Sequence, residues 1–254
     1  MRGFRHGESF AMRYSIVFAI SLLLGSSALA DGWPDCNQSF DLQRRLNGCT
    51  QVISEGGSDT KNTAIAYFNR GFTYDKLKQY NRAIQDYSSV IRLSPNDVDA
   101  YFNRGVDYQR LKLFSRAVQD YNSVLRRNPK HADAYINRGA VYIYLKQYQR
   151  AIQDLNLALR LSPKKAVAYL NRGLTYAKQN RYRRAIQDYN AALRLNPKYA
   201  NAYINRGLAF DELKQYRLAI LDYSALIRLK PKFTAAYVSR GAAYSRRGQY
   251  RRAI

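Results

Sequence analysis

The chain has 254 residues, of which 42 are Lys or Arg and 18 are Asp or Glu, so its formal net charge is +24. The sequence contains no Ser/His/Asp set and no glycine-rich phosphate loop. A metal site would need more ligands than the two cysteines, and the only histidines are His6, among the first 30 residues, and His131, far along the chain. We therefore expect a non-enzymatic protein with no cofactor and no bound metal. The 23 tyrosines are unusually many and need a structural explanation.

The first 30 residues have the features of an export signal. A basic leader precedes an apolar run at 16–24, and Ala28-Leu29-Ala30 has the small-x-small pattern of a cleavage site. The run is shorter than the ~20 residues that a membrane-spanning helix needs. We predict a bacterial protein that is exported to the periplasm or secreted and is cleaved after Ala30. An uncleaved anchor is the alternative, and Met12 is an alternative start.

Residues 31–61 are predicted to form an N-terminal cap for the array that follows. Residues 41–53 carry one apolar stripe at helical spacing, whereas 31–40 look irregular. Cys36 and Cys49 are the only cysteines, and in an oxidising compartment an isolated pair is expected to form a disulfide. This bond would fasten the irregular segment to a capping helix, which would cover the first apolar face of the array.

From residue 64 onward a 34-residue pattern recurs without insertion. Its units are 64–97, 98–131, 132–165, 166–199, 200–233 and a partial 234–254. A fixed period of this size is typical of a solenoid, in which each unit buries its apolar face by stacking on its neighbours. Each unit is predicted to contain two antiparallel helices, here called A and B. Positions are numbered as places 1 to 34 from the first residue of each unit.

The unit carries Tyr at place 4, Gly at place 8, an aromatic residue at places 11 and 17, Ala at place 20 and usually Tyr at place 24. This pattern resembles the tetratricopeptide repeat (TPR) family. The resemblance covers residues 64–254 and implies an all-α, right-handed superhelical solenoid of antiparallel helix pairs. It also implies a protein-interaction scaffold that binds a peptide or partner segment in its concave groove. The aromatic side chains are expected to be mostly core.

Place 7 departs from the family, because it carries Arg in every unit where Leu is usual. A buried arginine needs a partner, and folding the hairpin sets place 7 opposite place 23, which is Asp in all five complete units. An anion-binding arginine ladder is the alternative. The predicted ion pairs are Arg70 with Asp86, Arg104 with Asp120, Arg138 with Asp154, Arg172 with Asp188, and Arg206 with Asp222.

Places 5 and 6 are the candidate binding positions on the inner face. The place-6 series resembles the asparagine ladder of the repeat domain of O-linked N-acetylglucosamine transferase, which implies that these amides hold a peptide backbone. The alternative is that the amides are merely solvated. The asparagines are Asn69, Asn103, Asn137, Asn171 and Asn205. The apolar residues at place 5 are Phe68, Phe102, Ile136, Leu170 and Ile204.

Two other functions stay open. Arginines at places 19 and 29 and lysines in the turns predict a basic convex face that binds an anionic envelope component, such as lipid or polysaccharide. Export argues against nucleic acid as the partner. The chain could instead be an arm of a larger enzyme, because unit six stops at Ile254, partway through its second helix. That edge would then be covered by further chain or by a partner.

Overall fold

The structure is a computed structural model that describes residues 32–55 and 59–248. The described residues form thirteen helices and no strand, which confirms the all-α prediction. The N-terminal segment contains α1 (Trp33–Gln38) and α2 (Leu42–Ser54). The A helices are α3 (Thr60–Lys76), α5 (Val98–Arg110), α7 (Ala132–Tyr144), α9 (Ala166–Lys178), α11 (Ala200–Glu212) and α13 (Thr234–Arg246). The B helices are α4 (Tyr80–Leu93), α6 (Phe114–Arg127), α8 (Tyr148–Leu161), α10 (Tyr182–Leu195) and α12 (Tyr216–Leu229).

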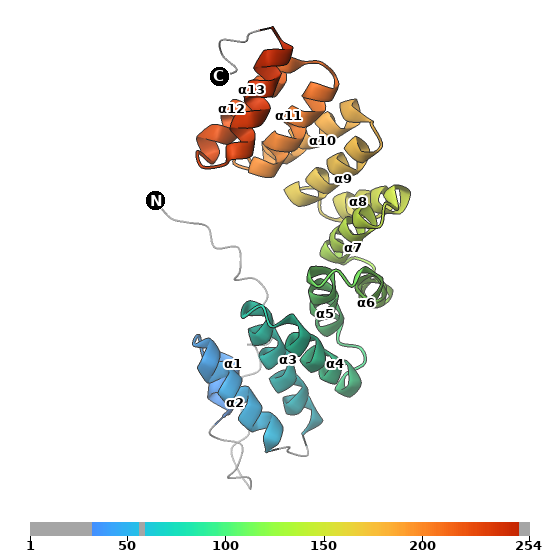
Figure 1. Cartoon of the computed structure of the whole chain (residues 1–254). Coiled ribbons are helices and arrows are strands. Elements are labelled where there is room, and N and C mark those ends of the chain that lie inside the picture. Colours follow the sequence, from blue (N-terminus) through green and yellow to red (C-terminus); the bar gives the residue numbers. More distant parts are fainter. Residues whose placement is uncertain (1–31, 56–58, 249–254) are drawn as a thin grey trace.

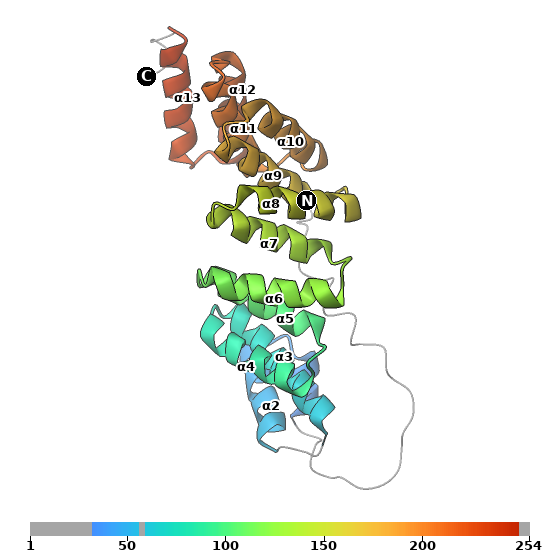
Figure 2. The same cartoon turned by 90° about the vertical axis from the view of Figure 1, so that its right-hand side faces the viewer.

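The helices are stacked in chain order. Each A helix packs against the B helix of its own repeat and against its neighbours in the adjacent repeats, whereas distant repeats do not touch. Figures 1 and 2 show the resulting elongated array, in which successive hairpins turn relative to one another. Burial in such a stack comes from nearest neighbours, so the molecule is a solenoid with a continuous core.

Within each hairpin, small residues let the two helices approach closely. The alanines at place 20 in repeats one to five are fully buried. A Cβ atom added at Gly207 would lie 2.6 Å from the Tyr223 ring, and one at Gly173 would lie 2.7 Å from the Tyr189 ring. Both distances are too short for non-bonded atoms. In these two repeats place 8 therefore has no room for any side chain beside the buried tyrosine ring at place 24.

The turn between helices A and B has the same backbone in five repeats. Place 15 has a positive φ of 57–60° in each of them. This left-handed conformation favours Gly or Asn. The fourth repeat has Asn180 at this place, but the other four repeats carry a lysine. Those lysines are Lys78, Lys112, Lys146 and Lys214.

The cap differs from its prediction in one respect. Residues 31–40 are not wholly irregular, because Trp33–Gln38 form the short helix α1, which has a proline near its start. The α1 helix packs on α2 where Gly32 and Gly48 meet, and a Cβ added at Gly48 would lie 2.6 Å from the Gly32 carbonyl oxygen. The predicted capping helix is α2, and Asp41 caps it by accepting a hydrogen bond from the Arg44 backbone N–H at 2.8 Å. The export signal, 1–30, and the start of the last B helix lie outside the described residues.

Candidate functional site

The arginine at place 7 is held by the aspartate at place 23 of the same repeat. Arg138 donates from Nε to Asp154 Oδ2 and from Nη2 to Asp154 Oδ1, both at 2.7 Å. Two parallel bonds fix the orientation of the guanidinium as well as its distance. The same pair of bonds, at 2.6–2.8 Å, joins Arg70 to Asp86, Arg104 to Asp120, Arg172 to Asp188 and Arg206 to Asp222.

The same guanidinium also reaches the preceding repeat, which the sequence analysis missed. Arg138 Nη1 donates to Asn122 Oδ1 at 2.5 Å. Asn122 is at place 25, and each repeat has Ser or Asn at that place. Equivalent bonds run from Arg172 to Asn156, from Arg206 to Asn190, from Arg104 to Ser88, and from Arg70 to Thr50 of the capping helix. Each arginine therefore closes its own hairpin and joins it to the element before it.

Aromatic rings cover the faces of these guanidiniums. Arg138 Cζ lies 5.6 Å from the Tyr135 ring centroid and 5.8 Å from that of Tyr142, which are at places 4 and 11. The hydrogen bonds that Arg172 donates to Asp188 raise the pKa of Arg172 above its ordinary value, even though burial lowers it. Most donors and both faces of the place-7 arginines are thus engaged within the protein. This geometry assigns them to the scaffold and leaves little room for the alternative anion-binding ladder.

The tyrosines expected to be core divide into two groups. The rings at place 24 are fully buried, namely Tyr87, Tyr121, Tyr189 and Tyr223. Most described rings at places 4, 11 and 17 are only half-buried, since they border the arginines and the edges of the hairpins. Tyr144, which belongs to none of these places, is 69% exposed and stacks on Phe114 with 5.3 Å between ring centroids.

The asparagines at place 6 are half-buried on the A helices. Three of them interact within the protein. Asn69 Nδ2 donates to the Cys36 carbonyl oxygen at 3.4 Å, Asn205 Nδ2 donates to the Asn201 carbonyl oxygen at 2.7 Å, and Asn137 hydrogen-bonds the Tyr121 hydroxyl. Within residues 32–55 and 59–248, the side-chain amides of Asn103 and Asn171 make no hydrogen bond. These two amides keep a donor and an acceptor for another molecule.

The side chains at place 5 are more buried than the predicted groove lining should be. Ile136 is 3% exposed and Leu170 is 7% exposed, so these two side chains do not line an open groove. They pack instead against helix B of their own repeat and against the next repeat, because the inner face of helix A merges there with its packing face. Ile136 clusters with Leu155 and Leu159 of α8 and with Ala168 of α9. Leu170 clusters with Tyr189 of α10 and Ala202 of α11. The remaining place-5 residues, Phe68, Phe102 and Ile204, are half-buried.

Place 9 supplies more accessible apolar surface on the same helices. Phe72, Val106 and Leu174 are half-buried, and Leu208 is 46% exposed. On an α-helix place 9 follows place 6 by three residues and place 5 by four, so the three places share one face. The candidate groove therefore consists of amides at place 6 beside apolar side chains at place 9, with a smaller contribution from place 5 than predicted.

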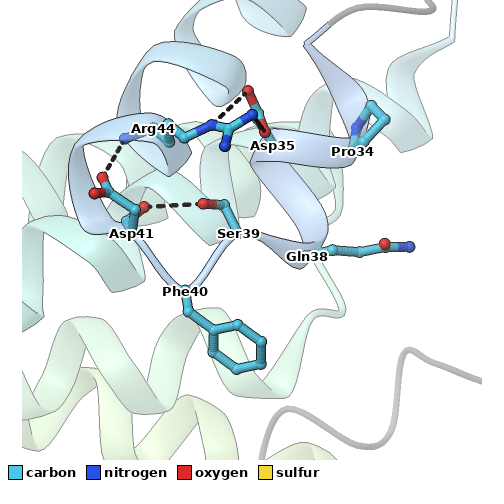
Figure 3. Close-up of a pocket in the computed structure, with 7 residues that line it drawn as sticks. All are labelled: Pro34, Asp35, Gln38, Ser39, Phe40, Asp41 and Arg44. Carbon is cyan, nitrogen blue, oxygen red and sulfur yellow. Dashed lines mark hydrogen bonds and ion pairs between the residues drawn. The ribbon is translucent and has the colours of Figure 1, made fainter.

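The cap is fastened by the Cys36–Cys49 disulfide, which joins α1 to α2. Near it lies a shallow hollow of about 400 Å³ that the sequence analysis did not identify. Figure 3 shows its lining, in which Arg44 bridges Asp41 and Asp35 while Phe40 points away from the helices. Phe40 is 99% exposed. The lining residues are Pro34, Asp35, Gln38, Ser39, Phe40, Asp41 and Arg44, and they include no nucleophile paired with a base.

The described residues offer neither a metal site nor a membrane-spanning helix. Within 32–55 and 59–248, no group of three or more His, Cys, Asp or Glu side chains is placed to hold a metal ion. Across the same part of the chain, every helix is too short or too polar to cross a bilayer.

These observations define a class of protein, a solenoid of two-helix repeats in which one half-buried arginine per repeat joins the repeat to its neighbour. Tetratricopeptide-repeat patterns match residues 64–97, 99–131, 132–165, 166–199 and 200–233, which together are more than half of the chain. The chain therefore belongs to the tetratricopeptide-repeat family. No curated protein matches the sequence significantly.

Solved structures share this fold at low sequence identity. A TPR protein from Parabacteroides merdae is 22% identical with a TM-score of 0.73, and the match covers 89% of this chain and 88% of that one. PilF of Pseudomonas aeruginosa is 18% identical with a TM-score of 0.67, over 76% and 88% of the two chains. YrrB, described as a TPR protein with an unusual peptide-binding site, is 22% identical with a TM-score of 0.59, over 75% and 96%.

Proposed function

We propose that this protein is a non-enzymatic scaffold that binds an extended peptide or partner segment along the inner face of its A helices. The observation that carries the proposal is the pair of unengaged amides, Asn103 and Asn171, on the same helix face as the apolar side chains at place 9. An amide can pair with a peptide group whatever the side chain of the ligand, and the apolar row adds contacts with alternate side chains. The peptide-binding site described for YrrB is consistent with this use of the fold.

A peptide library displayed on phage tests the proposal directly. Peptides selected on the wild-type protein should bind an Asn103→Ala/Asn171→Ala variant about thirtyfold more weakly, because each of the two lost hydrogen bonds contributes about 1 kcal/mol. The matched control is Asn47→Ala/Asn81→Ala, which removes two exposed amides outside the candidate groove. Equal binding by both variants, or selection of no peptide at all, would refute the groove.

We further propose that the protein acts after export, in the periplasm or outside the cell. The support is the leader pattern at 1–30 together with a disulfide between the only two cysteines, a pairing suited to an oxidising compartment. Mass spectrometry of the protein recovered from fractionated cells should find a mature chain that begins at Asp31. Recovery of the full-length chain from the cytoplasm would contradict export.

A further inference from the structure

One edge of the solenoid, formed by the turns between helices A and B, is strongly basic. We call places 12 to 19 of repeats one to five the turn edge. It carries 14 Lys and Arg against three Asp and Glu, and repeats two to four contribute nine of the cations and no acid. All three acids are engaged within the protein. Asp75 pairs with Arg110, Asp211 accepts from the Tyr223 hydroxyl at 2.8 Å, and Glu212 hydrogen-bonds Tyr182. The edge therefore presents a long run of uncompensated positive charge.

The backbone of the turns does not explain their lysines. Place 15 is in the left-handed conformation, where glycine fits without strain and other residues cost roughly 1–2 kcal/mol on the general scale for L-residues. Lysine nevertheless occupies this place in four of the five turns, including Lys112 and Lys146. All four lysine side chains are exposed. A residue with no structural advantage at its position is a candidate for a role in binding.

The arginines at place 19 stand at the unfavourable end of a helix. They are in the first turn of the B helices, where the helix dipole favours anions, and none of those first turns contains an acid. The place-29 arginines, such as Arg92 and Arg126, are in the last turns of the B helices, where the dipole favours cations. The helix dipole therefore explains the arginines at place 29 but not the arginines at place 19.

Each place-19 arginine in repeats one to four is held over an aromatic ring. Its Cζ lies 5.6–5.8 Å from the centroid of the place-11 ring of the same repeat. Stacking restricts the side chain before a ligand arrives and leaves guanidinium donors exposed. Within the described parts of the chain none of these four arginines forms an ion pair. They are Arg82, Arg116, Arg150 and Arg184.

The turn edge is also hollowed in the fourth repeat. A surface depression of about 320 Å³ is lined by Arg181, Arg183 and Arg184, together with Tyr182 and Leu213. Three arginines around one concavity give several fork-shaped donor groups within reach of a single anionic unit.

We propose that the turn edge binds a linear acidic polysaccharide, with its anionic units near the cations at places 15 and 19 and its strongest contact in the repeat-four depression. The basic groups recur once per repeat while the repeats turn along the array (Figures 1 and 2), so a flexible chain can follow the row, whereas a flat membrane meets only part of it. Single-stranded nucleic acid would need open aromatic faces for base stacking. Here the rings of Tyr74, Tyr108 and Tyr142 lie within 6 Å of guanidiniums from both place 7 and place 19.

Fluorescence anisotropy with fluorescein-labelled alginate oligomers, a linear polyuronate, tests this proposal on the full chain. Substituting Gln for Arg82, Arg116, Arg150 and Arg184 should raise the Kd about tenfold and flatten its salt dependence, on the scale of a few exposed ion pairs. The matched control substitutes Gln for Arg92, Arg126, Arg160 and Arg194 at place 29. It removes the same charge from another surface and should change the Kd less than about threefold.

A second variant separates binding from folding. Glycine in place of Lys78, Lys112, Lys146 and Lys214 relieves the left-handed turns, so it should raise the melting temperature while it weakens alginate binding. Equal weakening by the place-19 and place-29 variants would overturn the proposal, because net charge alone would then explain binding. Absence of alginate binding by the wild type would also overturn it, as would tighter binding to phosphatidylglycerol vesicles or to single-stranded DNA that depends on place 19.

Discussion

Arg138 and Asn122 are 16 residues apart and belong to different repeats, yet Arg138 Nη1 donates to Asn122 Oδ1 at 2.5 Å. The same arginine reaches 16 residues forward to Asp154. A single half-buried side chain therefore links helix B of one hairpin to both helices of the next. Because a solenoid has only nearest-neighbour interfaces, the strength of this contact sets how cooperatively adjacent repeats unfold.

Asn122→Ala should lower the unfolding free energy by about 1–3 kcal/mol, because it leaves a partly buried guanidinium donor without its acceptor. It should also broaden the urea transition as the coupling between repeats two and three weakens. Gln119→Ala, an exposed site on the same helix, is the control and should change stability by less than about 0.5 kcal/mol. Equal stability of the two variants would show that the Arg138–Asn122 bond does not couple the repeats.

Two buried tyrosines at place 24 differ in whether their hydroxyl is hydrogen-bonded. The Tyr121 hydroxyl donates to Gln109 Oε1 at 3.0 Å, whereas the Tyr189 hydroxyl is buried without a hydrogen-bond partner among the described residues. The cause is at place 12, where repeat two has Gln109 and repeat four has Ala177. Repeat three has no hydroxyl to satisfy, because places 12 and 24 are both apolar there. Ile143 at place 12 packs in the cluster that contains Leu155 at place 24.

Tyr121→Phe should therefore cost about 1 kcal/mol of unfolding free energy, while Tyr189→Phe should be neutral or stabilising. Both rings are fully buried and phenylalanine keeps the ring, so the two variants differ in whether the lost hydroxyl made a hydrogen bond. Urea denaturation followed by circular dichroism measures the difference. The explanation fails if both variants lose the same stability.

The repeat register and the Arg–Asp partners were predictable because each depends on one spacing that recurs five times. The bond from Arg138 to Asn122 was not, because Ser or Asn at place 25 looks like an ordinary polar surface residue. The burial of Ile136 and Leu170 was also missed. Helical periodicity places them on the inner face but cannot tell where that face ends and the contact with the next repeat begins.

Features that occur once were the hardest to predict. The helix α1 has only six residues, too few for a periodic pattern, and it is held by its contact with α2 and by the disulfide. Asp107 occupies place 10, where the other repeats have Thr, Val or Ala. No recurring partner residue therefore indicated that a carboxylate would be buried there. The groove itself depends on which amides remain unengaged, and only the structure separates Asn103 and Asn171 from the rest.

Removing the disulfide should loosen the cap and leave the centre of the array intact. The bond closes a loop across 13 positions, so Cys36→Ser/Cys49→Ser should cost roughly 3 kcal/mol on the chain-entropy model. Asn69 also bonds the Cys36 carbonyl oxygen, so the loss should reach the start of repeat one. Hydrogen exchange should become faster in α1, α2 and the N-terminal half of α3, and stay unchanged in α7 to α10. Unfolding of the whole chain on reduction would contradict a local role.

Asp107 gives the protein a defined pH dependence. Its side chain is buried on α5, and burial raises its pKa to about 7. Arg110 donates to one carboxylate oxygen at 3.2 Å and also pairs with Asp75 of α3. Tyr87 of α4 and Tyr121 of α6 are the other titratable groups that interact with the Asp107 carboxylate. A raised folded-state pKa means that the folded protein binds this proton more tightly than the unfolded chain does. The associated stability is complete below about pH 4 and is lost as the pH rises through 7.

Asp107→Thr should abolish this loss. Thr73 and Thr175 occupy the same place in repeats one and four, and each donates to the carbonyl oxygen four residues before it at 2.7 Å. The unfolding free energy of the variant relative to wild type should therefore increase by about 2–3 kcal/mol between pH 5 and pH 8. Thermal or urea unfolding at several pH values measures this difference, and Asp133→Asn, a half-buried carboxylate on α7, is the control. Parallel curves for Asp107→Thr and wild type would show that Asp107 stays ionised throughout, with Arg110 supplying enough compensation to keep its charge in the interior.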